Sequence, residues 1–580
     1  MTETDSRAGV RRAGGRGRFY SRVLIVLLLG VWILSQVGDD VGGPSAGCGA
    51  TTAPLAVSAD PLAATIDVHA GRRVRRIPRT LYGVNVEWTH DGMGLWDAKR
   101  GQLDSDLVQL SRELAVSSIR FPGGVYSDFY HWREGVGPQA TRPDSLHFTD
   151  GPKSRHAFGT DEALAFARAV DGELLITVNA GSGTPEEAAE WVRYVNPEND
   201  SGALDRRVTF WEVGNELYIK EDTPISKSVT ISPETYAERF IAFADAMRAA
   251  DPDIKIGAIG GENAGRYNTV SYAGWDRTVL TKAGHALDFL AVHNAYAPLV
   301  WDKGDRDLRT VYQAMLAAPS LIRQNLETLS DQIEHYVPER ADEITIAVTE
   351  WGPFFHADPT SPYVHHVKTL GSALFTASTL NVFIESEKVT VANAFKLNEI
   401  SFMGWISQRN GRWTPNGPYF ALQMYTRHFG DVLVDSTVDC PTFTSKALGV
   451  VEKVRGVPYL DVISGLSDDG ETLYVLGVNK HFDAPIEATI NIHDRKPRGD
   501  ATVWTLTGSG IDANTGTQLP KVPGLKWGTQ MTDTANPRFD KGNPQDVAIR
   551  SRTLTGVGSS FEFVFPKHSV CSVEIPLTPE

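Results

Sequence analysis

Short apolar segments alternate with helical patterns along most of the chain between residues 81 and 397. The apolar segments are nearly continuous, which is typical of parallel strands that are buried on both faces. In chain order they are LYGVNVE, SSIRFPGG, ELLITVNAG, VTFWEVGNE, IKIGAIGG, DFLAVHNAY, ITIAVTEW and ANAFKL. Eight strands that alternate with helices predict an α/β protein with a (β/α)8 TIM barrel.

Two of the segments between these strands carry clear helix signals. Thr184, Pro185 and Glu187 form a capping box with proline at the first helical position, and apolar residues follow at helical spacing. Ser232 and Pro233 open a second helix in the same way. These signals support the alternation of strands and helices on which the barrel prediction depends.

The pattern changes after His428. Apolar residues then recur at every second position, in the sets Ile486, Ala488, Ile490, Ile492 and Phe561, Phe563, Phe565. This period of two predicts an antiparallel β-sandwich, and residues 64 to 78 also read as a strand that completes it. We therefore expect a catalytic barrel at 79–429, a β-sandwich at 430–580, and one or more strands at 63–78 that join the sandwich.

The first 40 residues differ in character from the rest of the chain. A basic segment precedes the apolar run VLIVLLLGVWIL, Val23 to Leu34, which is typical of a signal peptide or signal anchor. Residues 41–62 are rich in Gly, Ala, Ser, Thr and Pro and read as a linker. The basic flank predicts an extracytoplasmic protein, secreted or membrane-anchored by this single N-terminal segment, with cleaved and anchored forms both open.

Composition narrows the choice of partners. The chain has 580 residues and a formal net charge of -15, which argues against nucleic acid and leaves neutral or cationic substrates. Its three cysteines lack the spacing of a metal site, while a disulfide between Cys440 and Cys571 stays open. The sequence has no nucleophile elbow, phosphate loop or HExxH motif, so we expect no metal or cofactor in catalysis.

Polar residues gather at the C-terminal ends of the predicted strands, where (β/α)8 barrels place their active sites. Glu216 follows the fourth strand, and Glu350 ends the seventh. Cleavage of a glycosidic bond needs two such carboxyl groups, one protonated to assist the leaving oxygen and one ionised to meet the sugar cation. A surface ion pair is the alternative role for either residue alone. The other polar residues at these ends are Arg120, Asn179, Asn215, His293 and Tyr296.

Each of these neighbours suggests a role. Asn215 can donate a hydrogen bond to the sugar 2-hydroxyl group. Arg120 either contacts the substrate or holds Glu350 ionised. His293 and Tyr296 either line the nucleophile or only bond to each other. Candidate stacking platforms for a sugar, each equally suited to the core, are Trp88, Trp96 and Trp351.

Four stretches of the chain are FWEVGNELY, RFPGGVYSDFYHWREGVGP, ITVNAGSGTPEEAAEWVRYVN and PKHSVCSVEI. With them, most of residues 78 to 578 resembles glycoside hydrolase family 51, the α-L-arabinofuranosidases of clan A. The resemblance implies a retaining mechanism with Glu216 as the acid/base and Glu350 as the nucleophile. It also implies that Glu87 binds sugar hydroxyls, with a buried ion pair to Arg120 as the alternative. Members of the family often form homo-oligomers.

The chain departs from the family pattern where the substrate is read. Val125 stands where the family usually has a sugar-binding asparagine, and His293 and Tyr296 are one residue further apart than usual. The nucleophile is followed by Trp351 and Gly352, where a Trp-Asn pair is common. These departures leave L-arabinofuranose, D-arabinofuranose and galactofuranose open as the sugar.

We therefore expect a retaining exo-glycosidase that removes α-arabinofuranosyl or related furanosyl residues from polysaccharide or oligosaccharide. The nearest alternative is another clan A retaining glycosidase, of the β-xylosidase or glucuronidase type, because fold and catalytic pair are shared. The alternative outside the enzymes is a non-catalytic glycan-binding protein at the cell surface.

Overall fold

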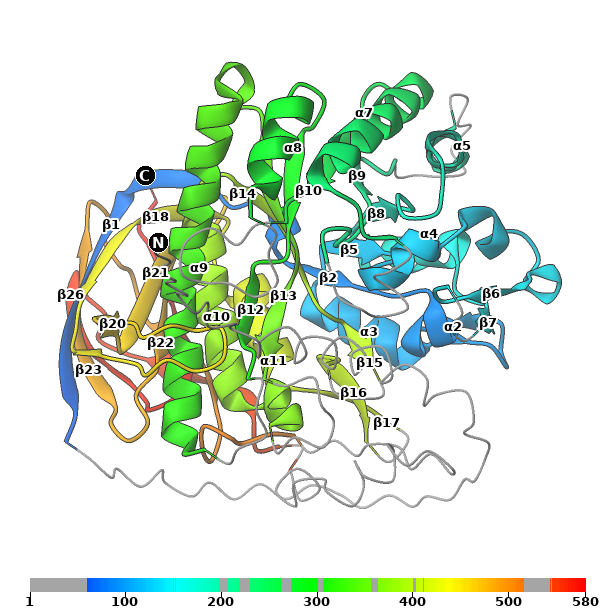
Figure 1. The fold of residues 1–580 in the computed structure, drawn as a ribbon. Coiled ribbons are helices and arrows are strands. Elements are labelled where there is room, and N and C mark those ends of the chain that lie inside the picture. Colours follow the sequence, from blue (N-terminus) through cyan, green and yellow to red (C-terminus); the bar gives the residue numbers. More distant parts are fainter. Residues whose placement is uncertain are drawn as a thin grey trace, which may run out of the picture.

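The structure of the protein is a computed structural model. It describes residues 60–149, 151, 153–197, 207–219, 229–261, 273–300, 306–355, 363–399, 403–409, 412–515, 543 and 545–579. These residues form a barrel with helices around it and a large sheet against one side of the barrel (Figure 1).

The barrel is a closed ring of eight parallel strands, and each of the eight segments expected from the sequence supplies one of them. The ring closes because the sixth strand pairs with the seventh and the eighth pairs with the first. A further strand, β12 (Ala295–Pro298), pairs with the far end of the seventh. The eight are β2 (Gly83–Asn85), β5 (Ser118–Phe121), β8 (Glu173–Val178), β9 (Phe210–Val213), β10 (Lys255–Ile259), β11 (Phe289–Val292), β13 (Thr345–Phe354) and β14 (Val389–Ala394).

A helix follows each barrel strand within the described residues and packs outside the ring (Figure 1). The expected caps are present, because Thr184 accepts a hydrogen bond from the Glu187 N–H and Ser232 accepts one from the Thr235 N–H. The helices are α3 (Ser105–Leu114), α4 (Thr160–Val170), α5 (Pro185–Val195), α7 (Pro233–Ala250), α8 (Trp275–Ala283), α9 (Leu308–Tyr336), α10 (Leu370–Glu385) and α11 (Gly417–His428).

Shorter elements fill the connections. They are η2 (Arg79–Leu81), α2 (Thr89–Met93), β3 (Trp96–Asp97), β4 (Gln102–Leu103), η3 (Gly124–Phe129), η4 (Trp132–Gly135), η5 (Gln139–Thr141), β6 (Asp144–Leu146), β7 (Lys153–Arg155), η6 (Pro338–Arg340), η7 (Val364–Lys368), β15 (Asn398–Glu399), β16 (Ile406–Arg409) and β17 (Arg412–Pro415).

The second unit is a sheet in which nine described strands form one ladder, in the order β25-β24-β27-β22-β21-β18-β1-β23-β26. All neighbours are antiparallel except β1 and β23, which run parallel. In Figure 1 the blue strand β1 lies among the yellow to red strands of the C-terminal part. The strands are β1 (Leu62–Arg76), β18 (Val432–Asp439), β21 (Leu460–Leu466), β22 (Thr472–Asn479), β23 (Ile486–His493), β24 (Ala501–Thr507), β25 (Ala548–Leu554), β26 (Ser560–Phe565) and β27 (Ser569–Pro576), with a separate pair β19 (Thr442–Phe443) and β20 (Val457–Pro458).

This sheet curves over its own core. Phe565, on the edge strand β26, packs so closely on β22 that a Cβ atom at Gly477 would lie 2.4 Å from its ring. The alternating residues of β23 face the same core, with Ile486, Ala488 and Ile490 all fully buried. Cys440 and Cys571 are both free thiols, so no disulfide joins them.

Helix α10 fills the space between barrel and sheet. It contacts β21, β22 and β27 of the sheet as well as β13 and β14 of the barrel. Its residues from Leu370 to Ile384 are all buried, as expected for a helix covered on all sides. The barrel and the sheet therefore share a core across this helix.

The localisation expected from the N-terminal segment is corrected by the structure. In the described part of the chain, no helix combines the length and the apolar character needed to cross a bilayer. The longest described helix, α9, has 29 residues but includes Arg323, Glu327 and Asp331. The apolar run at residues 23 to 34 lies outside the described residues. The expectation of a secreted or membrane-anchored protein is not retained.

Candidate active site

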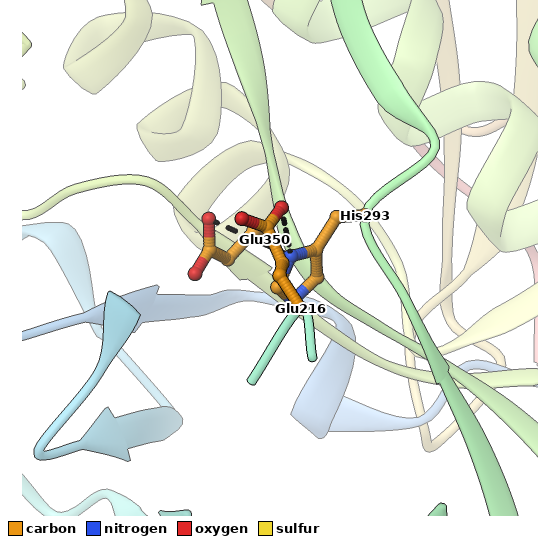
Figure 2. Close-up of side chains that lie close together, drawn as sticks. All are labelled: Glu216, His293 and Glu350. Atoms are coloured by element: carbon orange, nitrogen blue, oxygen red, sulfur yellow. Dashed lines mark hydrogen bonds and ion pairs between the residues drawn. The ribbon is translucent and has the colours of Figure 1, made fainter. Parts of the chain in front are cut away.

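The two carboxylates predicted from the sequence lie together at the C-terminal end of the barrel (Figure 2). Glu216 follows β9 in a turn where Gly214 and Glu216 itself both have positive φ, 81° and 43°. One carboxylate oxygen of Glu216, one of Glu350 and a ring nitrogen of His293 all lie within 4.8 Å of one another. Two residues that are 134 positions apart in sequence therefore bring their carboxyl groups to one place.

A β-bulge turns Glu350 toward the barrel interior. Val348 pairs with Ala392 and Trp351 with Ala394, so β13 has one residue more than β14 in this stretch. An extra residue of this kind re-aims the side chains that follow it. Thr349 and Glu350 consequently both point inward, although neighbours in a regular strand point to opposite faces.

Both carboxylate oxygens of Glu350 accept hydrogen bonds. The Nη1 atom of Arg120 lies 2.9 Å from Oε1, and the Tyr296 hydroxyl lies 3.0 Å from Oε2. Burial, followed by the charges of Glu350 and Glu216, raises the pKa of Tyr296 well above its usual value, so its hydroxyl remains a donor. Two donors on two oxygens suit an ionised carboxylate.

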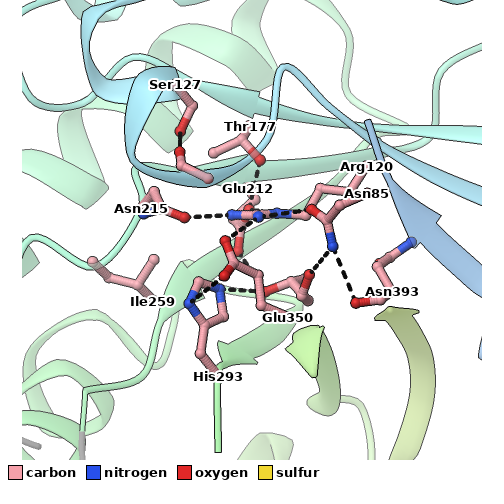
Figure 3. A network of polar contacts seen from close by, with 12 residues as sticks. Asn85, Arg120, Ser127, Thr177, Glu212, Asn215, Ile259, His293, Glu350 and Asn393 are labelled. Carbon is pink, nitrogen blue, oxygen red and sulfur yellow. Dashed lines mark hydrogen bonds and ion pairs between the residues drawn. The ribbon is translucent and has the colours of Figure 1, made fainter. Parts of the chain in front are cut away.

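Arg120 connects four polar side chains, and one of them is Glu350 (Figure 3). Its Nε lies 2.6 Å from Glu212, its Nη1 lies 3.0 Å from Asn85 and 2.9 Å from Glu350, and its Nη2 lies 2.9 Å from Asn215. Burial alone would lower the pKa of Arg120, but the charges of Glu212 and Glu350 outweigh it and raise the pKa further. The side chain is fully buried, and its donors are directed at protein atoms.

Glu212 is the main residue of this network that the sequence analysis did not single out. It is fully buried inside the barrel and accepts hydrogen bonds from Thr177, at 2.6 Å, and Thr349, at 2.8 Å, in addition to Arg120. A signal was present, because Glu212 interrupts an apolar strand at the position two after Phe210. A carboxylate in such a strand is costly unless it is paired.

The contacts of Asn215 fix the orientation of its side-chain amide. Arg120 offers only donors, so the atom that it contacts must be the amide oxygen of Asn215. The amide nitrogen is then directed away from Arg120, and it is buried without a hydrogen-bond partner in the described part of the chain. A sugar hydroxyl is a suitable acceptor for it.

His293 links the two carboxylates to the network below. Its Nδ1 lies 2.9 Å from Glu216 and 3.8 Å from Glu350, and its Nε2 lies 3.2 Å from the Thr349 hydroxyl. That hydroxyl donates to Glu212, so it accepts from His293 Nε2–H. Nδ1 is therefore the ring nitrogen that exchanges a hydrogen bond with Glu216. Burial lowers the pKa of His293, but the charge of Glu350 and the hydrogen bond with Glu216 leave it above its usual value.

Glu87 also lies at the barrel mouth, but its partner is not Arg120. Its carboxylate lies 2.6 Å from the Lys396 ammonium, which lies 3.5 Å from Glu399 on its other side. Burial raises the pKa of Glu87, and Lys396 partly opposes this effect. Lys396 joins the first and eighth strand ends and was not singled out in the sequence.

The three tryptophans considered as sugar platforms differ in exposure. Trp351 is fully buried, with edge contacts to Phe383 and Trp405, so no face of its ring is free for a sugar. Trp88 is also fully buried and stacks on His156. Trp96 is half-buried, and its indole N–H donates to Gln139.

Among the described residues, one group of side chains is close enough to hold a metal ion, and it consists of Glu216, His293 and Glu350. Glu216 already bonds to His293, and Glu350 to Arg120 and Tyr296. The two carboxylates thus lie close together, and each is held by hydrogen bonds to its own partners. A (β/α)8 barrel with such a pair at its C-terminal mouth defines a glycoside hydrolase.

Comparison with known proteins identifies the family. Residues 110–288 match the family model of the α-L-arabinofuranosidase 1 domain, and residues 349–536 match that of the α-L-arabinofuranosidase C-terminal domain. Glu216 falls in the first match and Glu350 in the second. The chain belongs to glycoside hydrolase family 51, and it is an enzyme of the α-L-arabinofuranosidase type.

Individual relatives agree with this assignment. A probable α-L-arabinofuranosidase C of Aspergillus terreus is 27% identical over 87% of this chain and 96% of its own length. An intracellular exo-α-L-arabinofuranosidase of Bacteroides ovatus is 25% identical over 75% of this chain and 85% of its own length. The crystal structure of an α-L-arabinofuranosidase from Thermotoga maritima in complex with arabinose superimposes with a TM-score of 0.72 at 25% identity, covering 89% of this chain and all of the other.

Proposed function

We propose that the protein is a retaining exo-glycosidase in which Glu350 attacks the anomeric carbon and Glu216 protonates the leaving oxygen. The covalent glycosyl-enzyme is then hydrolysed by a water molecule that Glu216, now ionised, activates as a base. The observation that supports this proposal is the spacing of the two carboxylates, whose nearest ligand atoms lie within 4.8 Å. Retaining enzymes hold their carboxyl groups about 5 to 5.5 Å apart, whereas inverting enzymes need about 6.5 to 9.5 Å to admit water.

The partners of each carboxylate support the assignment of roles. Glu350 receives donors on both oxygens and suits the part of the ionised nucleophile. Glu216 shares a proton with His293 and suits the part of the acid. Once Glu216 has given up its proton, the same contact can hold the ionised carboxylate that serves as base.

The remaining predicted site residues divide into two groups in this proposal. Asn215 and Glu87 contact sugar hydroxyls in this proposal, because both lie at the mouth of the barrel. The amide nitrogen of Asn215 is directed away from its protein partner, and the carboxylate of Glu87 is shared with Lys396. Arg120 holds Glu350 and Asn215 in place beneath the sugar, and Tyr296 orients Glu350. Trp351 packs against Phe383 and Trp405 and takes no part in stacking.

We propose α-L-arabinofuranosyl groups as the sugar and exo cleavage as the mode, because the relatives carry these words in their names. D-arabinofuranose and galactofuranose are the competing sugars, since Val125 stands where the family usually has a sugar-binding asparagine. The catalytic unit in this proposal is the barrel at 79–429, with the sheet unit contributed by both 63–78 and 430–580.

The test is release of 4-nitrophenol from aryl furanosides of the three sugars and from aryl xylopyranoside and glucuronide. We expect turnover of one furanoside, and a loss of roughly 10⁴-fold or more in kcat for Glu350→Ala. Glu173→Gln is the matched control, because Glu173 is an exposed carboxylate at the opposite end of the barrel, and it should keep wild-type kcat. NMR of the first-formed product should show the anomeric configuration of the substrate, and an inverted product would contradict the mechanism.

A further inference from the structure

Asp128 is a buried carboxyl group beside the catalytic pair that the mechanism above does not use. It lies in η3, in the connection after the second barrel strand, and its exposed fraction is 1%. Its Oδ2 accepts a hydrogen bond of 3.0 Å from the backbone N–H of Asn215. That N–H immediately precedes Glu216.

The connections after the second, third and fourth strands meet at Asp128. Its backbone carbonyl accepts hydrogen bonds from the N–H and the hydroxyl of Ser182, at 3.2 and 2.9 Å. A Cβ atom at Gly181 would lie 2.7 Å from the Asp128 Cβ, and one at Gly214 would lie 3.4 Å from Oδ1. Two glycines thus leave the room that this side chain occupies.

The segment that Asp128 holds has an unfavourable backbone conformation. Glu216 has φ of 43°, in the left-handed region that a glutamate seldom adopts. Such a residue keeps its conformation only where the surroundings over-determine it. The Arg120 guanidinium donates to the amide oxygen of Asn215, and the Asp128 carboxyl group accepts from the Asn215 N–H. The turn is therefore fixed from two sides.

We propose that Asp128 is a positioning residue that holds the Asn215–Glu216 turn, so that the Glu216 carboxyl group reaches the leaving oxygen. The inference rests on the proposed role of Glu216 as the acid. The contact needs an acceptor of this length at position 128 and does not need a negative charge. Burial raises the pKa of Asp128 to about 8, with the Asn215 N–H opposing it, which agrees with a group that acts as a neutral acceptor near pH 7.

A leaving-group comparison separates positioning from a merely structural role. Methanol must be protonated as it leaves a methyl furanoside, whereas 4-nitrophenolate leaves without a proton. The kcat/KM value reports steps up to the first bond cleavage, where the acid acts. We expect Asp128→Ala to lower kcat/KM about 10²-fold for the methyl glycoside and only a few-fold for the nitrophenyl glycoside of the same sugar.

Asp128→Asn is the conservative variant, because its amide oxygen can still accept from the Asn215 N–H. It should keep wild-type kcat/KM for both substrates. Asp288→Ala is the matched control: its carboxylate accepts the Ile256 N–H at 2.8 Å, but at the N-terminal end of the barrel. Asp288→Ala should lower Tm and leave the ratio of the two kcat/KM values unchanged.

Equal losses for both substrates in Asp128→Ala would overturn the proposal and leave Asp128 as a structural residue. If Asp128→Ala does not fold, Asp128→Ser provides the same comparison, since a serine hydroxyl is too short to reach Asn215. A crystal structure of either variant should show the 2.9 Å contact between Glu216 and His293 lost, and its retention would also overturn the proposal. Glu216→Gln tests the underlying mechanism separately. If Glu216 is the acid, this variant should lose more kcat/KM on the methyl glycoside than on the nitrophenyl glycoside, whatever the role of Asp128.

Discussion

The interior of the barrel has two layers of opposite character. The layer nearer the N-terminal ends of the strands is apolar, with Leu175, Phe289, Ala291, Ala347 and Val391 in one cluster and Phe210 packed against it. The layer above it is polar and contains the Arg120 network. Five strands place one residue in the apolar layer and the residue two positions on in the polar layer, in the pairs Leu175 and Thr177, Phe210 and Glu212, Ala291 and His293, Ala347 and Thr349, Val391 and Asn393.

The difference shows that a step of two residues along a strand separates stabilising residues from functional ones. Burial of the apolar layer lowers the free energy of folding directly. The polar layer gains little, because removing charges from water offsets much of their attraction. Its residues are explained by what they hold in place rather than by the stability that they add.

The largest expected effect comes from breaking the polar layer at Glu212. Glu212→Leu leaves the Arg120 guanidinium buried with one acidic partner fewer, and we expect a loss of about 3 kcal/mol in the free energy of unfolding. We also expect kcat to fall about 10²-fold, because Arg120 no longer holds Glu350 and Asn215 in position. Chemical denaturation and steady-state kinetics measure the two effects.

The double variant Arg120→Met with Glu212→Leu sharpens the comparison. Replacing both charges by apolar groups removes the unpaired guanidinium but leaves Glu350, Asn85 and Asn215 without their donor, so we expect only part of the lost stability to return. Activity should stay low. Recovery of kcat in the double variant would show that the network is not needed for positioning.

A substitution in the apolar layer should have the opposite profile. Leu175→Ala removes buried methyl groups and should cost about 2 to 5 kcal/mol in the free energy of unfolding. Leu175 belongs to the apolar cluster and donates no hydrogen bond to the site, so kcat per folded molecule should stay at the wild-type value. A fall in kcat comparable to that of Glu212→Leu would mean that the two layers are not functionally separate.

The smallest expected effect concerns pH. The pKa of His293 is raised, so the proton that it shares with Glu216 stays bound above pH 6.5 and is lost as pH rises through the raised value. We expect kcat/KM of the wild type to fall over that range. In His293→Gln the fall should begin at lower pH, and a shift of one pH unit would reduce kcat/KM about tenfold on the alkaline side.

The same titration affects stability. A pKa that is higher in the folded state contributes stability that is fully present below pH 6.5 and is lost as pH rises through the folded value. Thermal melts of wild type and His293→Gln at pH 6 and pH 9 should therefore converge at the higher pH. Melts that differ equally at both values would contradict a raised pKa for His293.

Much of the fold could be predicted from the sequence because the barrel strands are apolar on both faces. A continuous apolar run identifies such a strand without knowledge of its neighbours, and Glu216 and Glu350 stand where two of these runs end. The antiparallel strands after His428 were equally readable, because Ile486, Ala488 and Ile490 follow the period of two that a single buried face imposes.

The parts of the site that could not be predicted depend on register and on long-range contacts. The direction in which Glu350 and Trp351 point depends on a bulge, which becomes visible only when β13 is paired with β14. Lys396 meets Glu87 across 309 residues of sequence, and Asp128 meets Asn215 across 87. Nothing local to either residue indicates its partner.

The position of β1 in the sheet has a consequence for how the chain is assembled. Its two neighbours, β18 and β23, both come from the other side of the barrel in sequence, so the whole barrel is an insertion between strands that lie side by side. During synthesis β1 emerges before the barrel, and the two strands with which it pairs emerge only after the barrel. Removing it would leave two facing strand edges open in the middle of the sheet, with unpaired backbone groups that invite pairing with other chains. By pairing with β18 and β23, β1 thus connects the start of the barrel to the strands that follow its end.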